Sequence, residues 1–262
     1  MGVRKVGRVG ASVAAVVLLG AVVSACGDSD DGGGLFDEAK ESPSASRSAS
    51  ASPEADASPE PADVPAAKVP PASVNDLDGV PAKVDGGVIT VGEPSAKITV
   101  KVYEDPRCPY CKKFEEGGAQ ALVPELASGD VKVEYTIASF LDNNFGGSGS
   151  KNAANALRAA VDTGRYPQFH AALFANQPEE SEDGFTPAFL VKIGEAAGIK
   201  DAKFTDAVTK GAYRSWVTTA MSAFTKDGVS GTPTVEIDGE KAPADALYSE
   251  KEFAALLKKA GA

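Results

Sequence analysis

The sequence predicts an α/β domain at residues 83–262, preceded by a disordered tether. An all-helical insertion at about 149–227 divides the sheet-forming parts of this domain. Short runs in which apolar residues alternate with polar ones occur before residue 140 and again after residue 230, which is typical of strands. Between these runs, apolar residues recur at helical spacing. The stretch before residue 83 is rich in Ser, Pro, Ala and acidic residues and has no sustained period, so we expect it to be disordered.

Residues 1–25 have the layout of a secretory signal, with a basic start, an apolar middle and small residues at the end. The apolar run at residues 9–23 is shorter than the roughly 20 residues of a membrane-spanning helix. The segment that ends in Cys26 (VSAC) resembles the lipobox of bacterial lipoproteins, here of an actinobacterial type. We therefore expect Cys26 to carry a lipid that anchors the chain to the outer face of the cell membrane. The alternative is an ordinary signal with a chance cysteine.

The expected tether spans residues 26–82 and holds most of the acidity of the chain. The protein has a formal net charge of −11, and residues 27–80 contribute 12 acidic and 3 basic residues. The remaining domain is only mildly acidic. No basic patch or nucleic-acid motif stands out, so we expect no nucleic acid as a partner.

Four apolar alternating runs are the expected strands. The second places Ile98, Val100 and Val102 on one face and leads directly into a pair of cysteines. A polar, glycine-containing stretch at residues 142–147 is the expected loop after the third run. The four runs are residues 88–91, 98–103, 131–137 and 234–237.

The expected helices begin at capping residues. Pro109 suits the first turn of a helix that starts at Cys108. Within the insertion, Thr186 and Asp201 precede two of the helical runs, and Ser249 with Glu252 forms a capping box for the last helix. Aromatic residues at helical spacing are expected to belong to the core rather than to a ligand site: Phe169, Phe174, Phe204, Trp216 and Phe224.

Cys108 and Cys111 form a Cys-x-x-Cys pair, which can belong to a zinc site, a haem attachment or a redox centre. Structural zinc takes four ligands, and beyond this pair the chain offers one histidine, His170, and the cysteine expected to be lipidated. A covalent haem requires a histidine directly after the second cysteine, where Lys112 stands. We therefore expect no metal, and we expect His170 to be an ordinary helix residue.

Redox chemistry fits the local residues. The thiolate is the attacking species, and unpaired N–H groups at a helix N-terminus favour a thiolate at Cys108. Arg107, Lys112 and Lys113 are expected to add positive charge. Cys111 lies about one turn further on and can close a disulfide. A static structural disulfide is the alternative, although closing so short a loop constrains little of the unfolded chain.

Three motifs in order resemble the DsbA-like thiol-disulfide oxidoreductases of the thioredoxin-like fold. They are the run from Tyr103 to Cys111 (YEDPRCPYC), the paired stretches 153–157 and 169–177 (AANAL and FHAALFANQ), and residues 228–234 (GVSGTPT). The resemblance implies a thioredoxin-like mixed sheet with an all-helical insertion. It also implies that Pro233 is cis and lies beside Cys108.

The resemblance further assigns roles. Cys108 would form a mixed disulfide with the substrate that Cys111 resolves, and no cofactor beyond their redox-active disulfide is implied. Pro109, Tyr110, Thr232 and Pro233 would contact the substrate. The implied partners are exported proteins that contain cysteines and a quinone-linked membrane protein that reoxidises the pair, with the chain a monomer.

The direction of the reaction stays open in the sequence. Strong oxidants of this family have a histidine at the position of Tyr110, so a less oxidising couple is expected here. Oxidation of exported proteins is the leading hypothesis. The alternatives are a disulfide reductase or isomerase of the envelope, and a non-catalytic binding module with the same fold.

Overall fold

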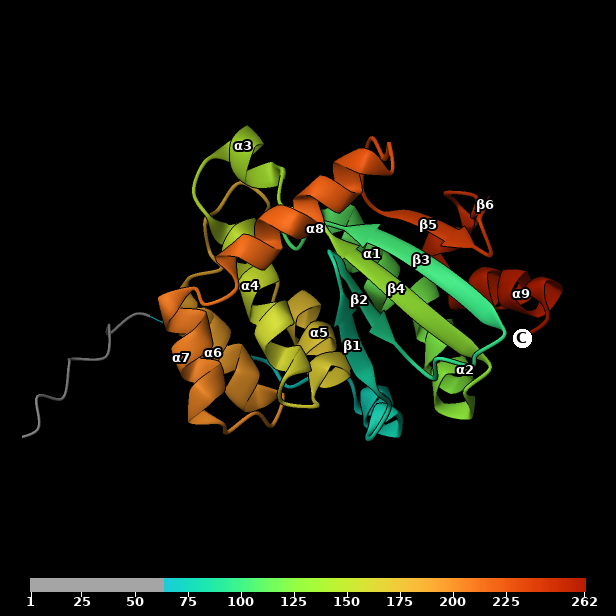
Figure 1. Ribbon diagram of the computed structural model, residues 1–262, viewed down its shortest axis with the longest axis horizontal. Coiled ribbons are helices and arrows are strands. Elements are labelled where there is room, and N and C mark those ends of the chain that lie inside the picture. The colour runs from blue at the N-terminus through green and yellow to red at the C-terminus, as the bar shows by residue number, and fades with distance from the viewer. Residues whose placement is uncertain (1–63) are drawn as a thin grey trace, which may run out of the picture. The chain divides into compact units, whose positions relative to one another are not determined.

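The structure is a computed structural model that describes residues 64–262 (Figure 1). The expected signal peptide, Cys26 and most of the expected tether lie outside the described residues, so these predictions stay predictions. Within residues 64–262, no helix has both the length and the apolar character needed to cross a membrane.

The centre of the fold is a mixed six-stranded sheet in the order β1-β2-β4-β3-β5-β6. The two central strands, β3 and β4, run parallel, and the other neighbours are antiparallel. Alternate residues of both strands are buried, and the last three residues of each are buried on both faces. The strands are β1 (Ala82–Asp85), β2 (Val88–Val91), β3 (Ile98–Glu104), β4 (Val131–Ile137), β5 (Thr234–Ile237) and β6 (Glu240–Lys241).

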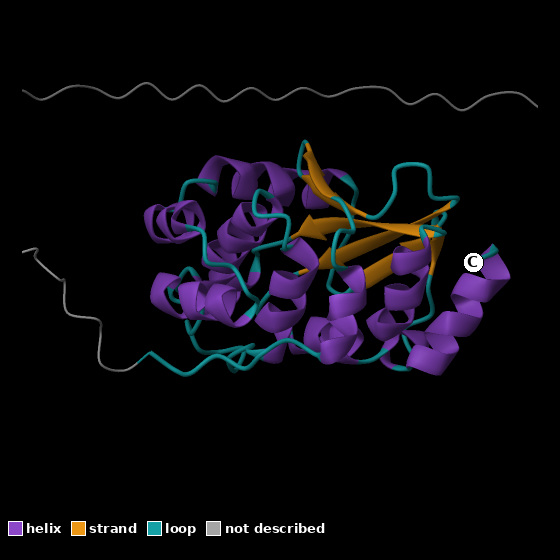
Figure 2. Cartoon of the chain, turned by 90° about the horizontal axis from the view of Figure 1, so that it is seen from below, coloured by secondary structure: helices purple, strands orange, loops and turns teal. Residues whose placement is uncertain are grey.

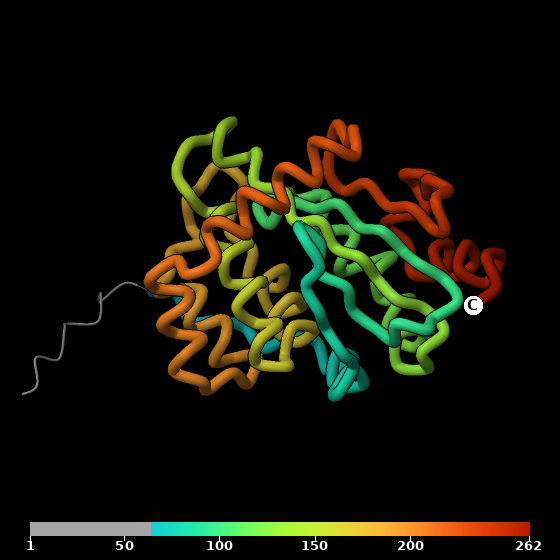
Figure 3. The backbone as a smooth tube through the Cα atoms, in the orientation of Figure 1, coloured from blue at the N-terminus to red at the C-terminus, as the bar shows by residue number. Residues whose placement is uncertain are grey.

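Helices cover the sheet and form a separate group beside it (Figures 1 and 2). The α-helices are α1 (Pro109–Glu116), α2 (Leu122–Ser128), α3 (Leu141–Phe145), α4 (Gly149–Val161), α5 (Tyr166–Ala175), α6 (Pro187–Ala196), α7 (Ala202–Lys210), α8 (Arg214–Lys226) and α9 (Glu250–Ala260). Three 3-10 helices are η1 (Ala72–Leu77), η2 (Gly118–Ala121) and η3 (Ala246–Tyr248). The tube in Figure 3 follows the chain from α7 along α8 back to β5. In the sequence, the helices from α4 to α8 thus lie between β4 and β5.

The predicted α/β class with a helical insertion is confirmed, as are the four predicted strands and the predicted caps. The side chains of Thr186, Asp201 and Ser249 each accept a hydrogen bond from a backbone N–H in the first turn of α6, α7 and α9. The helical pattern that contains Phe204, Trp216 and Phe224 is divided between α7 and α8 at Gly211. This glycine has φ +64°, a left-handed conformation that ends a helix.

Three parts of the fold differ from the expectation. The expected loop at 142–147 contains the short helix α3, and the short strands β1 and β6 were not predicted. The folded part also begins before the expected boundary at residue 83, because η1 lies within the stretch expected to be disordered. Val74 and Leu77 of η1 are buried in the core. Two apolar residues in a polar stretch are too weak a pattern to reveal this docking from the sequence alone.

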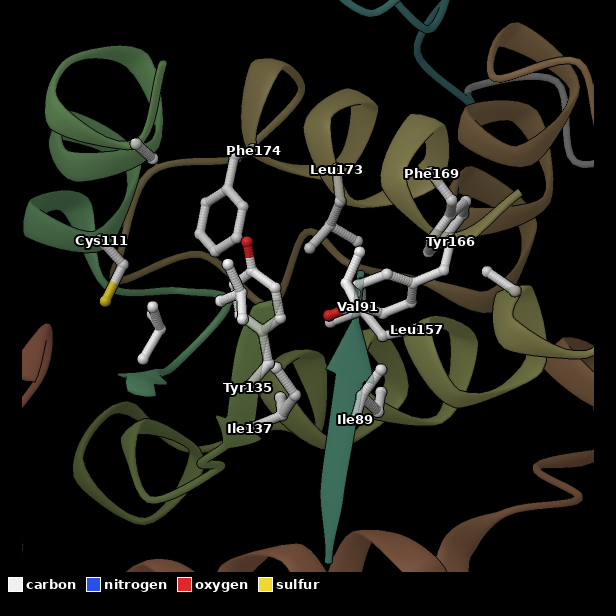
Figure 4. Close-up of a cluster of buried hydrophobic side chains, with 14 of the residues drawn as sticks. Ile89, Val91, Cys111, Tyr135, Ile137, Leu157, Tyr166, Phe169, Leu173 and Phe174 are labelled. Atoms are coloured by element: carbon white, nitrogen blue, oxygen red, sulfur yellow. The ribbon is translucent and has the colours of Figure 1, made fainter. Parts of the chain in front are cut away.

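The core joins the sheet to the helical group (Figure 4). Side chains from β2 and β4 pack against side chains from α4 and α5, and Cys111 lies at one edge of this cluster. All five aromatic residues expected in the core are buried there or in the smaller cluster around Phe224. The labelled cluster comprises Ile89, Val91, Tyr135, Ile137, Leu157, Tyr166, Phe169, Leu173 and Phe174. The two cysteines therefore belong to the same packed core as the sheet and the helical group.

Candidate active site

The two cysteines lie where β3 passes into α1. Cys108 is the N-cap residue of α1, and its N–H donates to the carbonyl of Asp105 at 2.9 Å. Pro109 occupies the first turn, as predicted. Both cysteines are free thiols, with Cys111 fully buried and Cys108 retaining 5% exposure. Of the two buried cysteines, only Cys108 therefore retains contact with solvent.

The surroundings of Cys108 favour its thiolate. The pKa of Cys108 is lowered to about 6, with a hydrogen bond from Cys111 as the largest cause and burial acting in the opposite direction. The side chain of Thr232 and the backbone N–H groups of Tyr110 and Cys111 contribute to this lowering. These N–H groups belong to the first turn of α1, so the expected effect of a helix N-terminus is present.

The positive charge expected from Arg107 beside Cys108 is engaged elsewhere. The Arg107 side chain is 2% exposed and donates to the carbonyl of Glu180 at 2.8 and 3.1 Å. It also donates to Asp142 at 3.1 Å and to the carbonyl of Gly146 at 2.8 Å. The guanidinium group thus holds two loops together. The low pKa of Cys108 arises from hydrogen bonds.

Cys111 has the opposite environment. Burial is the main cause that raises the pKa of Cys111 well above its usual value, followed by the hydrogen bond to Cys108 and the charges of Cys108 and Glu104. At neutral pH the pair therefore consists of a thiolate at Cys108 and a protonated thiol at Cys111. An accessible nucleophile beside a buried thiol is the asymmetry that disulfide exchange requires.

The loop before β5 faces the reactive sulfur. The Thr232–Pro233 peptide bond is cis, as the resemblance implied. In its thiol form, Cys108 donates through Sγ to the carbonyl oxygen of Thr232 at 3.4 Å. Pairing of β5 with β3 fixes this meeting, because Thr234 lies opposite Tyr103 in the sheet. Thr232, Pro233 and Pro109 are half-buried around Cys108, and Tyr110 is exposed.

The helical group holds the backbone of the cysteine turn. The side-chain amide of Gln177 donates to the carbonyls of Pro106 and Cys108 at 2.8 and 2.9 Å. Asp105 accepts from the hydroxyl of Ser150 at 2.6 Å and from two backbone N–H groups. Burial raises the pKa of Asp105 to about 6. The turn before α1 is therefore set partly by residues that follow β4.

A buried acidic cluster below Cys111 was missed by sequence reasoning. His170, expected to be an ordinary helix residue, lies between Glu104 at the end of β3 and Glu115 in α1. Its Nε2 is 2.7 Å from Glu104, and its Nδ1 is 3.6 Å from Glu115. The oxygens Glu104 Oε2 and Glu115 Oε1 are buried without a partner. The available signal was the spacing of Cys111 and Glu115, which places them one turn apart on α1.

The acidic cluster holds protons. Burial raises the pKa of Glu115 to about 8. Burial alone would lower the pKa of His170, but the carboxylates of Glu104 and Glu115 raise it to about 9. One ligand atom from each of the three residues lies within 4.8 Å of the others, close enough to be considered for a metal ion. However, the two nitrogens of His170 face different carboxylates, with a hydrogen bond to Glu104 and a longer ion pair to Glu115, rather than one coordination point.

The region of this chain that resembles known proteins contains the site described above. The family model described as Thioredoxin matches residues 84–259. Disulfide bond formation protein D of Bacillus subtilis is 27% identical over 168 residues, which cover 63% of this chain and 73% of that protein. Two solved structures from Mycobacterium tuberculosis have a TM-score of 0.52. Reduced DsbG is 28% identical, and the match covers 65% of this chain and 84% of that one. Oxidised DsbA is 26% identical, and the match covers 66% of this chain and 99% of that one.

Proposed function

Because this chain belongs to the thioredoxin family and is a DsbA-like thiol-disulfide oxidoreductase, we propose that it oxidises paired cysteines of exported proteins through Cys108 and Cys111. The observation that carries the proposal is the difference between the two thiols. Cys108 is accessible and has a pKa of about 6, whereas Cys111 is buried and its pKa is raised.

The oxidised pair begins the reaction as a Cys108–Cys111 disulfide. A substrate thiolate attacks the sulfur of Cys108, the Cys108–Cys111 bond breaks, and Cys111 leaves and takes up a proton. The second substrate thiolate then attacks the substrate sulfur of the mixed disulfide and releases Cys108 as a thiolate. Two electrons pass from the substrate to the pair, and the substrate gains a disulfide. When Cys111 attacks Cys108 instead, it resolves the mixed disulfide and frees the substrate unchanged.

The low pKa of Cys108 supports the oxidising direction. A thiol with a low pKa is a good leaving group, and stabilising the thiolate stabilises the reduced form of the pair. A pair with a more stable reduced form is a stronger oxidant. The pKa of about 6 lies between that of a free cysteine, roughly 8.5, and that of the strongest oxidants, roughly 3.5. We therefore propose a moderately oxidising couple.

The proposed place of this reaction is outside the cytoplasmic membrane, with a lipid at Cys26 as the anchor. The secretory-signal layout and the lipobox-like VSAC segment support it. The proposed partner for reoxidation is a quinone-linked membrane protein, with the domain acting as a monomer and without an added cofactor. Replacing Cys26 with serine is expected to release the protein from the membrane fraction, and a variant that stays bound would refute the anchor.

The redox potential tests the proposed direction. The purified domain is equilibrated with glutathione buffers, and the free thiols are quantified by alkylation. We expect a potential of about −200 to −120 mV, in the range of oxidising members. A value near that of thioredoxin, roughly −270 mV, would assign a reductase instead. In cells, Cys111→Ala is expected to trap substrates on Cys108, and a complete lack of trapped species would favour a binding module.

A further inference from the structure

The first part of the described chain is attached to the end of α5. The side-chain amide of Asn176 accepts a hydrogen bond from the N–H of Lys68 at 2.6 Å and donates to the carbonyl of Lys68 at 2.8 Å. Asn176 is 7% exposed, and its amide also donates to the carbonyl of Ala172 at 2.8 Å. Both N–H groups and the oxygen of this amide are therefore used, as a buried amide requires.

The next residue binds the cysteine turn. Asn176 is the C-cap of α5, and Gln177 follows it directly. The side-chain amide of Gln177 donates to the carbonyls of Pro106 and Cys108 at 2.8 and 2.9 Å, while its backbone N–H donates to the carbonyl of Phe174 at 3.2 Å. Two neighbouring residues at the end of one helix therefore bind the start of the described chain and the reactive turn.

A helix end stays in place only where other groups bind it. The last turn of a helix frays readily, because its carbonyls lack partners within the helix. At the end of α5, Asn176 binds the helix carbonyl of Ala172 and the backbone of Lys68 together. The same segment is also held at the beginning of α5, where Gln168 donates to Asp78 at 2.8 Å. Contacts at both ends of α5 thus attach the segment to the helix.

We propose that Asn176 is a positioning residue for disulfide exchange, and that its contact with the Lys68 peptide keeps Gln177 on the carbonyls of the cysteine turn. This inference rests on the proposed function, because it concerns how the reactive turn of that reaction is held. When the Lys68 peptide leaves Asn176, the end of α5 loosens and Gln177 no longer holds the two carbonyls. Fewer molecules then have a reactive turn. A residue within the expected spacer thereby influences the reactivity of Cys108.

The test removes the N–H of Lys68 in the full chain. Lys68→Pro lacks this donor and leaves the buried oxygen of Asn176 without it. The oxidised protein is mixed with dithiothreitol, and the rate of loss of the Cys108–Cys111 disulfide is measured. We expect the rate to fall about five-fold, which corresponds to the loss of one hydrogen bond. Gln177→Ala is expected to cause a similar loss, and a wild-type rate in Gln177→Ala would overturn the inference.

A double-mutant cycle shows whether the two contacts act as one unit. Because Lys68→Pro acts through Gln177, the double variant should react no more slowly than Gln177→Ala alone. Losses that multiply would overturn the inference, since the two changes would then act independently. The midpoint pH of Cys108 alkylation should rise equally in both single variants and in the double variant, because each loses the donor beside the carbonyl of Cys108.

Two further variants control for side effects. Val69→Pro places a proline one position later, where the N–H makes no hydrogen bond within residues 64–262, and it is expected to react like the wild type. Asn176→Ala breaks the same contact from the helix side. It should reproduce the rate loss even if Lys68→Pro fails to fold, which thermal unfolding reports. A wild-type rate in folded Lys68→Pro, or an equal loss in Val69→Pro, would overturn the inference.

The inference and the proposed function fail in different ways. If the wild-type protein reacts and folded Lys68→Pro reacts equally fast, the role of Asn176 is wrong and the proposed function stands. If the wild-type protein does not exchange its disulfide with dithiothreitol, the proposed function is wrong, and the alkylation midpoints alone decide the role of Asn176. A redox potential in the range of a reductase would refute the proposed direction and leave the comparison between variants valid.

Discussion

The sulfur of Cys108 lies 3.4 Å from the carbonyl oxygen of Thr232, although 124 positions separate the two residues in the chain. The antiparallel pairing of β3 with β5 brings them together, since each residue lies just outside its strand on the same edge of the sheet. The reactive thiol and the loop that faces it therefore form one unit, whose geometry depends on the sheet.

The pH dependence of alkylation tests the environment of Cys108. Because only the thiolate reacts, the rate of Cys108 alkylation is expected to reach half its maximum near pH 6 and to rise above it. Cys111→Ser keeps a donor but replaces the thiol, and Cys111→Ala removes the donor altogether. We expect Cys111→Ala to move the midpoint upward by about one pH unit or more, the worth of one hydrogen bond to a charged group. A wild-type midpoint near pH 8.5 would contradict the structure.

The hydroxyl of Thr232 is expected to make a smaller contribution. It is a lesser cause of the lowered pKa than the bond from Cys111. Thr232→Val removes the hydroxyl and keeps the shape of the side chain, so the pKa of Cys108 should rise by less than in Cys111→Ala. Absorbance of the thiolate during a pH titration measures both shifts. Ser230→Ala, two residues earlier and exposed, is the matched control and should leave the titration unchanged.

Protons in the buried acidic cluster should make stability fall as pH rises. The pKa of Glu115 is raised from 4.5 to about 8 and that of His170 from 6.5 to about 9. For each residue, at a pH between its unfolded and its folded pKa, the folded state therefore holds more protons than the unfolded state. The free energy of unfolding must then decrease with increasing pH, its contribution being complete below the unfolded pKa values and lost above the folded ones. Urea unfolding at several pH values from 5 to 9 measures this slope.

A suitable background keeps this slope interpretable. Cys108 has a lowered pKa and contributes a slope of the opposite sign between about pH 6 and 9, so the experiment uses Cys108→Ser. In that background, Glu115→Gln mimics the protonated acid and should flatten the curve. Stability that rises with pH in Cys108→Ser would refute the proton-holding cluster.

Arg107 is expected to matter for stability and not for the thiolate. Arg107→Met leaves Asp142 buried without its guanidinium partner at 3.1 Å, which costs about 3–5 kcal/mol. The pKa of Cys108 should change little, because hydrogen bonds from other groups set it. Arg165→Met, which breaks a partly exposed pair with Asp78 at 3.5 Å, is the control and should cost less than about 1 kcal/mol. Urea unfolding and thiolate titration separate the two effects.

The sequence predicted those parts of the site whose chemistry is local. Cys108, Pro109 and Cys111 lie within four positions of the chain and have a recognisable spacing, and the cis bond before Pro233 was implied by the motif around it. Glu104, Glu115 and His170 come from a strand and two helices, and only tertiary packing makes them neighbours. Arg107 was expected to act as a charge beside Cys108, because a sequence does not show that Asp142 and two carbonyl groups bind its side chain.

The fold follows the same division. Strands with clear alternation and helices with capping residues were predicted, since each follows from residues close in the chain. The start of the folded part was not predicted correctly, because the burial of Val74 and Leu77 depends on contacts of η1 with α2 and α5. Likewise, the role of Gly117 and Gly118, which follow the helix of the cysteine pair, is not visible in the sequence. Their actual role is to admit η3, which lies far along the chain.

The contacts of Gln177 and Ser150 set a limit on how this protein can be miniaturised. A shortened version that joins β4 directly to β5 would keep every strand and both cysteines. It would lose the amide that binds the carbonyls of Pro106 and Cys108, and the hydroxyl that binds Asp105. Any engineered minimal domain would therefore need replacement donors for these three acceptors before it could carry the same reactive turn.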